Sequence, residues 1–174
     1  MDSPRGKLGL EELSTLVSEG AVDTVLVAFT DHYGRLMGKR YDAGFFLEEA
    51  ARGGSHACDY LLTVHRDMNP LPGFDFANWE RGYGDVHLVP DLDTLRLASW
   101  LERTALVLCD VEAQGSHEPL PIAPRSVLRR QVERAAALGL SAMAATELEF
   151  YMYRDSYAEA AAKGHAGLDP TGWY

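Results

Sequence analysis

The sequence predicts an α+β fold in which a small mixed unit is followed by a helix and a single strong strand. Two observations support this. In the first 113 residues, short stretches with β-type alternation are interrupted by helical spacing, and after the polar, proline-bearing stretch Gln114–Ala123 the pattern changes to one helix and one strand. Hydrophobic residues make up 47% of the 174 residues, which is enough to bury a core.

The first elements are a helix and a hairpin. Leu10–Glu19 has apolar residues at helical spacing and predicts a helix, and Val22–Thr30 alternates as a strand does. Arg35–Tyr41 predicts a second strand. The turn Asp31–Gly34 lies between the two strands, so they are expected to pair as a hairpin.

The remainder of the front part predicts one helix and several short strands. Asp42 can cap a helix over Phe45–Arg52, which the following glycines end. The loop Trp79–Asp85 is expected to be ordered. Four strands are expected: Asp59–Val64, Asp85–Val89, Leu95–Ala98 and Ala105–Val111.

The back part is expected to start a second domain, with Gln114–Ala123 as the linker. Pro124 predicts the first position of a helix that ends at Gly139. Leu140–Tyr153 predicts a long strand and Tyr157–Lys163 a short helix. Because one strand cannot form a sheet, it either joins the first sheet or pairs with residues beyond 174.

Charge and composition narrow the class of protein. The formal net charge of −10 argues against nucleic acid or an anionic membrane surface as the main partner. Cys58 and Cys109 form no paired motif and are expected to be reduced. The polar N-terminus lacks a signal-peptide core, and no apolar run approaches the ~20 residues of a membrane span, so we expect a soluble cytoplasmic protein.

Glu147 and Glu149 are the candidate functional residues. Two residues apart on a strand, their side chains point to the same face, with Cα atoms roughly 6–7 Å apart. Two like charges so placed are compatible with a divalent cation between or beside them. From the spacing alone, a solvent-facing edge strand with two glutamates is the commoner explanation.

Five segments follow one another in the sequence: an early hairpin of the form D-x-x-G-x-x-x-G-K-R, a loop before a Pro-Asp turn, a strand, a helix opening and an E-x-E motif. They are Asp31–Arg40, Trp79–Asp91, Ala105–Val111, Pro124–Leu128 and Thr146–Phe150. In this order, from about Val22 to the C-terminal end, the chain resembles the glutamine synthetase superfamily. No single segment is specific, but their order is.

An N-terminal tail and helix are expected at residues 1–20 from the residues themselves. The resemblance implies a β-grasp domain at 21–116, and at 117–174 the beginning of a truncated catalytic domain of α/β barrel-like form. It implies an ATP-dependent ligase that joins the γ-carboxyl of glutamate to an amine through a γ-glutamyl phosphate. The resemblance further implies Mg²⁺ or Mn²⁺, held in part by Glu147 and Glu149 at two different metal positions, and a homo-oligomer. As a fragment, the 174-residue chain alone is expected to be inactive.

The sequence leaves open which amine accepts the γ-glutamyl group. Bacterial ammonia-using members carry a D-G-S-S loop, which the matching region Asn69–Trp79 lacks. Ammonia is therefore in doubt, and the chain looks more like the enzymes that join glutamate to polyamines or other amines. Asp75 could attract a cationic amine, although an ordinary surface role is favoured. Two alternatives remain: a non-catalytic β-grasp binding or regulatory module, and a pseudoenzyme.

The other polar and aromatic residues are expected to have structural or surface roles. His32, in the hairpin turn, is expected to be solvated. The other five histidines show no ligand-type spacing to one another, so no metal role is expected for them: His56, His65, His87, His117 and His165. Lys39 and Arg40 are expected to be surface charges. Trp79 and Tyr83 are expected to serve packing or subunit contacts.

Overall fold

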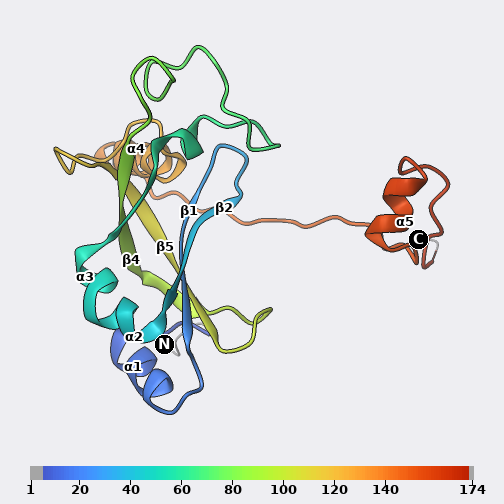
Figure 1. Cartoon of the computed structure of the whole chain (residues 1–174), viewed down its shortest axis with the longest axis horizontal. Coiled ribbons are helices and arrows are strands. Elements are labelled where there is room, and N and C mark those ends of the chain that lie inside the picture. Colours follow the sequence, from blue (N-terminus) through green and yellow to red (C-terminus); the bar gives the residue numbers. More distant parts are fainter. Residues whose placement is uncertain (1–5, 173–174) are drawn as a thin grey trace. The chain divides into compact units, whose positions relative to one another are not determined.

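The computed structural model describes residues 6–172, which form two compact units, one ending at Leu140 and the other beginning at Ser141. The first unit is built on a five-stranded mixed sheet with strand order β2-β1-β5-β4-β3 (Figure 1). Strands β1 and β5 run parallel, and every other neighbouring pair is antiparallel. The strands are β1 Thr24–Thr30, β2 Leu36–Asp42, β3 Ser55–Cys58, β4 Asp85–Leu97 and β5 Thr104–Ala113.

Helices cover the sheet and close the core. Fully buried side chains of the sheet, such as Val25 and Leu88, belong to the same cluster as Leu13 and Phe46 from the helices. Burying each such side chain stabilises the fold by about 1.5–3 kcal/mol. The helical elements of this unit are α1 Leu10–Ser18, α2 Ala43–Phe45, a π-helical turn Phe46–Ala50, α3 Ala51–Gly53, a 3-10 helix Asp59–Leu62 and α4 Pro124–Ala137.

The expected hairpin is confirmed, and its motif residues build the turn. The buried Asp31 carboxylate accepts hydrogen bonds from the backbone N–H groups of Tyr33 (2.9 Å) and Arg35 (2.8 Å) and from Nε of Arg35 (2.7 Å). Gly34 adopts a φ of 75°, which favours glycine. A Cβ on Gly38 would lie 2.0 Å from the carbonyl oxygen of Val27, so β1 and β2 can approach only because this residue is glycine.

Several expected elements need correction. The Asp42 cap is confirmed, because its Oδ1 accepts from the N–H of Phe45 at 3.0 Å. The strand expected at Asp59–Val64 is wrong: Asp59–Leu62 is a 3-10 helix, and the strand β3 precedes it. The two strands expected within 85–98 are one strand, β4, with a register irregularity between Asp91 and Arg96. Pro90 does not end it, because proline is tolerated beside a bulge.

The stretch 114–123, expected to be a linker, packs onto the first unit. Leu120 and Ala123 are buried, and the N–H of Leu120 donates to the carbonyl of Val111. Helix α4 begins at Pro124, as predicted, and Gly139 lies just after it with a φ of 74°. The apolar side chains of α4 are largely exposed, although helical spacing of this kind is typical of a buried face.

The strand expected at Leu140–Tyr153 is wrong for this chain. Residues 141–152 are extended but form no strand with any described residue, and only Tyr153 makes a β-bridge, to Pro170. A lone strand is unstable because, without a neighbouring strand, its backbone N–H and C=O groups hydrogen-bond to water instead. The helix expected next is confirmed as α5 Tyr157–Ala162, begun by a reciprocal capping box of Ser156 and Glu159.

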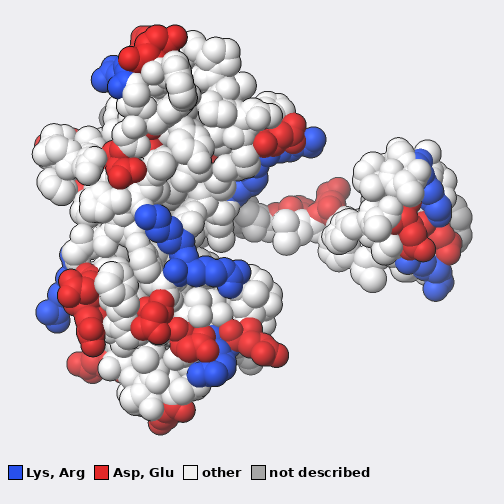
Figure 2. Space-filling model, in the orientation of Figure 1, with Lys and Arg blue, Asp and Glu red and all other residues white. Residues whose placement is uncertain are grey.

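The surface carries charges of both signs. On the visible face of the first unit, acidic and basic side chains are interspersed with large uncharged areas (Figure 2). Among the described residues, no helix has the length and apolar character that crossing a membrane requires.

Candidate functional site

Glu147 and Glu149, the expected metal ligands, lie on the extended segment of the second unit. Both are exposed, as are their apolar neighbours Leu148 and Phe150. Among the described residues, neither glutamate belongs to a group of three or more potential ligands. Carboxylate oxygens suit Mg²⁺ or Mn²⁺, but Mg²⁺ requires about six ligands. The donor chemistry of the pair therefore fits such a metal, and the pair alone does not complete a site.

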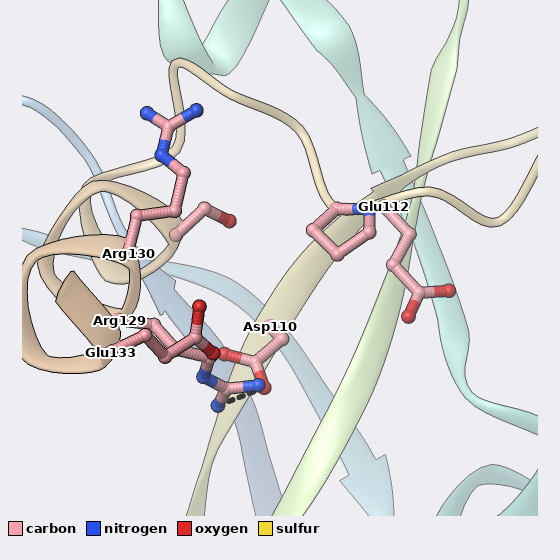
Figure 3. Close-up of a pocket in the computed structure, with 7 residues that line it drawn as sticks. Asp110, Glu112, Arg129, Arg130 and Glu133 are labelled. Atoms are coloured by element: carbon pink, nitrogen blue, oxygen red, sulfur yellow. Dashed lines mark hydrogen bonds and ion pairs between the residues drawn. The ribbon is translucent and has the colours of Figure 1, made fainter. Parts of the chain in front are cut away.

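A charged cluster fastens α4 to the sheet in the first unit. Arg125, in the first turn of α4, donates through Nε to Asp110 of β5 (3.0 Å) and through Nη2 to Asp91 of β4. One helical turn later, Nη2 of Arg129 donates to the other oxygen of Asp110 (2.6 Å; Figure 3). Burial lowers the pKa of Arg125, but the hydrogen bond and the charge of Asp110, followed by those of Asp91, raise it overall. The guanidinium therefore stays charged.

A small pocket of about 140 Å³ adjoins this cluster between α4 and β5. Two of its guanidinium groups already have partners: Arg129 binds Asp110, and Arg130 donates to the carbonyl of Pro121 at 2.7 Å. In Figure 3 the carboxylate of Glu112 points away from the helix. The pocket thus lies at the junction that holds α4 on the sheet, and the ion pair of Arg129 with Asp110 supports a structural role. The lining residues are Asp110, Glu112, Pro119, Ser126, Arg129, Arg130 and Glu133.

Two histidines meet at the end of the sheet where β4 begins and β5 ends, which their sequence spacing did not indicate. His87 of β4 lies opposite Glu112 of β5, and the turn after β5 brings in His117. One potential ligand atom of each residue lies within 4.8 Å of the others. No local motif could have shown this, because cross-strand register decides which residues face each other.

The remaining candidates have the environments expected of surface and core residues. Lys39, Arg40 and Asp75 are exposed. Trp79 is 82% exposed and meets Tyr83 edge to face, as Tyr83 does with Tyr60.

The two cysteines are free and lie in different environments. Cys58 is exposed, whereas Cys109 is fully buried. Burial, with the charge of Asp110 as the next cause, raises the pKa of the Cys109 thiol to about 12. The Cys109 thiol is therefore an inert core group.

Comparison with known proteins defines the class of the chain. Residues 121–170 match the family described as "Glutamine synthetase, catalytic domain". The fold is also similar to that of a "novel glutamine synthase homolog" (21% identity, TM-score 0.55, covering 67% of this chain and 27% of that one) and of ligand-free GmaS (25% identity, TM-score 0.54, covering 72% and 26%).

Curated relatives agree with that class. The gamma-glutamylethanolamide synthetase GlnA4 of Streptomyces coelicolor is 46% identical over 167 residues, covering 96% of this chain and 36% of the relative. The glutamate–isopropylamine ligase of a Pseudomonas species is 34% identical, covering 97% of this chain and 37% of the relative. The chain belongs to the glutamine synthetase family, and it spans about a third of the length of these relatives.

Proposed function

We propose that the full-length protein is an ATP-dependent ligase that joins the γ-carboxyl group of glutamate to a small primary amine. The observation that carries the proposal is the 46% identity to a gamma-glutamylethanolamide synthetase over 96% of this chain. The glutamate–isopropylamine ligase, at 34%, is a second relative whose name contains an alkylamine. The absence of a D-G-S-S loop at Asn69–Trp79 also favours an amine over ammonia.

The proposed reaction has two steps. A γ-carboxylate oxygen attacks the γ-phosphorus of ATP and ADP leaves, which gives γ-glutamyl phosphate. The amine nitrogen then attacks the acyl carbon and loses a proton, phosphate leaves with the former carboxylate oxygen, and the amide remains. Divalent metal, when bound, supplies charge neutralisation to the phosphoryl groups.

The proposed contribution of this chain is part of the metal site and the N-terminal scaffold. Glu147 and Glu149 would each hold one of two Mg²⁺ or Mn²⁺ ions, with their other ligands supplied by the rest of the full-length protein. We further propose that residues 21–116 form a β-grasp domain and that the catalytic domain begins at 117.

Exposed apolar side chains support the proposal that the remainder of the full-length protein packs against residues in the second half of this chain. Many of them lie between residues 127 and 157, on α4 in the first unit and, separately, along the extended segment of the second unit. Large apolar side chains that are exposed close together on one element often mark a surface that binds other protein. The exposed set includes Leu128, Leu138, Met143, Leu148, Phe150 and Tyr157.

The experiment uses the full-length enzyme with glutamate, ATP and Mg²⁺, and compares ethanolamine, isopropylamine, a polyamine and ammonia. We expect glutamate-dependent phosphate release, with a γ-glutamyl amide detected by mass spectrometry and a higher kcat/KM for a small amine than for ammonia. Glutamate labelled with ¹⁸O in the γ-carboxylate should transfer one ¹⁸O to the phosphate. Release of unlabelled phosphate, or equal use of ammonia, would contradict the proposal.

A matched pair of variants tests the metal ligands. Glu147→Gln and Glu149→Gln keep the size of each side chain and remove its charge. We expect each to reduce kcat by at least about 100-fold, as loss of electrostatic stabilisation does elsewhere. Glu118→Gln, also exposed but outside the E-x-E motif, serves as the control. Activity of the double Gln variant close to wild type would remove the pair from the site.

A further inference from the structure

His87, Glu112 and His117 form a compact group in the first unit. Nδ1 of His117 lies 3.3 Å from Nδ1 of His87, and Oε2 of Glu112 lies 3.5 Å from His87 Nδ1 and 3.7 Å from His117 Nδ1. Three potential ligand atoms therefore converge on one point, although the residues come from two strands and a turn.

The spacing of these atoms has the dimensions of a metal site. The nearest point equidistant from three atoms with these separations lies in their plane, about 2.0 Å from each, and an ion slightly out of that plane would be only a little farther away. Zinc binds imidazole nitrogen at ~2.0–2.1 Å and carboxylate oxygen at ~2.0–2.2 Å, and tetrahedral angles then separate the ligand atoms by about 3.3–3.5 Å. A hydrogen bond between His117 and His87 explains one of the three short separations but not all of them.

The outer contacts of His87 set the required tautomer. Its Nε2 lies 3.0 Å from the carbonyl oxygen of Gly53, which can only accept, so Nε2 carries the proton and Nδ1 keeps its lone pair. This is the arrangement by which a backbone carbonyl orients a metal-binding imidazole. His117 must move its Nδ1 proton to Nε2 to bind, and its exposed ring allows this exchange with water.

The surroundings hold the rings in place. A Cβ on Gly54 would lie 2.3 Å from Nε2 of His87, so only glycine lets the chain close over this ring. The His87 side chain is 13% exposed and that of Glu112 is 22% exposed. His117 adopts a φ of 56°, unusual for a residue with a side chain, and its N–H donates to the carbonyl of Ala113 at 2.9 Å.

We propose that His87, Glu112 and His117 bind one divalent transition-metal ion of the Zn²⁺ class, with water in the fourth position. Two imidazoles and one carboxylate suit Zn²⁺, whereas Mg²⁺ and Ca²⁺ prefer ligand sets made of oxygen. The ion would join β4, β5 and the turn after β5. This site shares no residue with the proposed carboxylate pair at Glu147 and Glu149, and the proposal does not depend on the ligase activity.

The test titrates the apo chain with Zn²⁺ in the presence of about a thousand-fold excess of Mg²⁺, which oxygen-only sites would bind. Isothermal calorimetry should give one Zn²⁺ per chain. Co²⁺ at the same site should show the intense visible absorption of tetrahedral coordination. At a zinc concentration 100 times Kd, thermal unfolding should shift upward by about 5–10 °C.

His117→Asn is the decisive variant, because asparagine tolerates the positive φ and lacks the imidazole. It should keep the circular dichroism spectrum and apo Tm, and raise Kd at least about 100-fold. His165→Asn is the matched control, since His165 also has a positive φ (60°) and lies in the second unit. Glu147→Gln with Glu149→Gln should bind zinc as wild type does. No binding by wild type, or equal binding by His117→Asn, would overturn the proposal.

Discussion

Replacing Asp31 by asparagine should destabilise the first unit measurably, although the side chain keeps its size. Asparagine can still accept the two backbone N–H bonds through its carbonyl oxygen, but it loses the charged hydrogen bond from Arg35 Nε (2.7 Å). Hydrogen bonds to charged groups contribute about 1.5–3 kcal/mol, and Asp31 is only 2% exposed, so we expect a loss of about 2 kcal/mol. Asp31→Ala also loses the backbone bonds and should cost about 4 kcal/mol.

The same contact predicts a pH dependence. Burial raises the pKa of Asp31, but the side-chain hydrogen bond of Arg35 and the backbone N–H groups of Arg35 and Tyr33 lower it overall. Because the folded pKa lies below the unfolded value of about 3.9, the stabilisation is fully present above the unfolded value and is lost as pH falls through the folded value. The difference between wild type and Asp31→Asn should therefore shrink at low pH.

Urea denaturation followed by circular dichroism at pH 7 and at pH 2–3 measures both effects. Asp93→Asn is the control, since Asp93 has a 96% exposed side chain and a long 3.7 Å ion pair, and it should change the free energy of unfolding by less than about 0.5 kcal/mol. An Asp31→Asn effect that is equally large at both pH values, or below about 0.5 kcal/mol at pH 7, would refute the reasoning.

Three further changes have expected outcomes. Gly38→Ala places a Cβ against the Val27 carbonyl and should destabilise the β1–β2 pair by more than about 3 kcal/mol in the same urea assay, and a loss below about 1 kcal/mol would contradict this. Arg125→Met leaves two partly buried carboxylates short of a partner and should cost about 2 kcal/mol, with faster hydrogen exchange in α4. Under native conditions a thiol reagent should modify Cys58 and leave Cys109 unmodified until the chain unfolds.

The local elements of the fold could be predicted where one short segment carried its own signals. The helix α1, the hairpin, the Asp42 cap and the start of α4 at Pro124 all depend on neighbouring residues, and the structure confirms them. The strand expected after Leu140 failed for a different reason. Its alternation describes what the side chains favour, but a strand exists only when another strand accepts its backbone groups.

The candidate sites likewise include one that a short segment reveals and others that depend on residues far apart in the sequence. The E-x-E motif of Glu147 and Glu149 is local, so the resemblance could single it out, and its metal role stays a prediction. The contacts of Arg125 with Asp91, and of His87 with Glu112 and His117, join residues 25 to 34 positions apart. The contact of His87 with Glu112 follows from the register of β4 on β5. The other two also require the placement of helix α4 and of the turn after β5, and no short motif specifies any of these.

The parallel pairing of β1 with β5 constrains how the chain can fold. Val25 lies opposite Ala105, so the paired residues are about 80 positions apart in the sequence. Pairing them closes a long loop, and this loss of chain entropy comes before the contacts that offset it. The β1–β2 hairpin and the β3–β4–β5 meander can form locally, but the sheet becomes continuous only when these halves dock. During synthesis on the ribosome, one edge of β1 therefore stays unpaired until β5 has emerged. Because this pairing is long-range, we expect the first unit to fold slowly for its size.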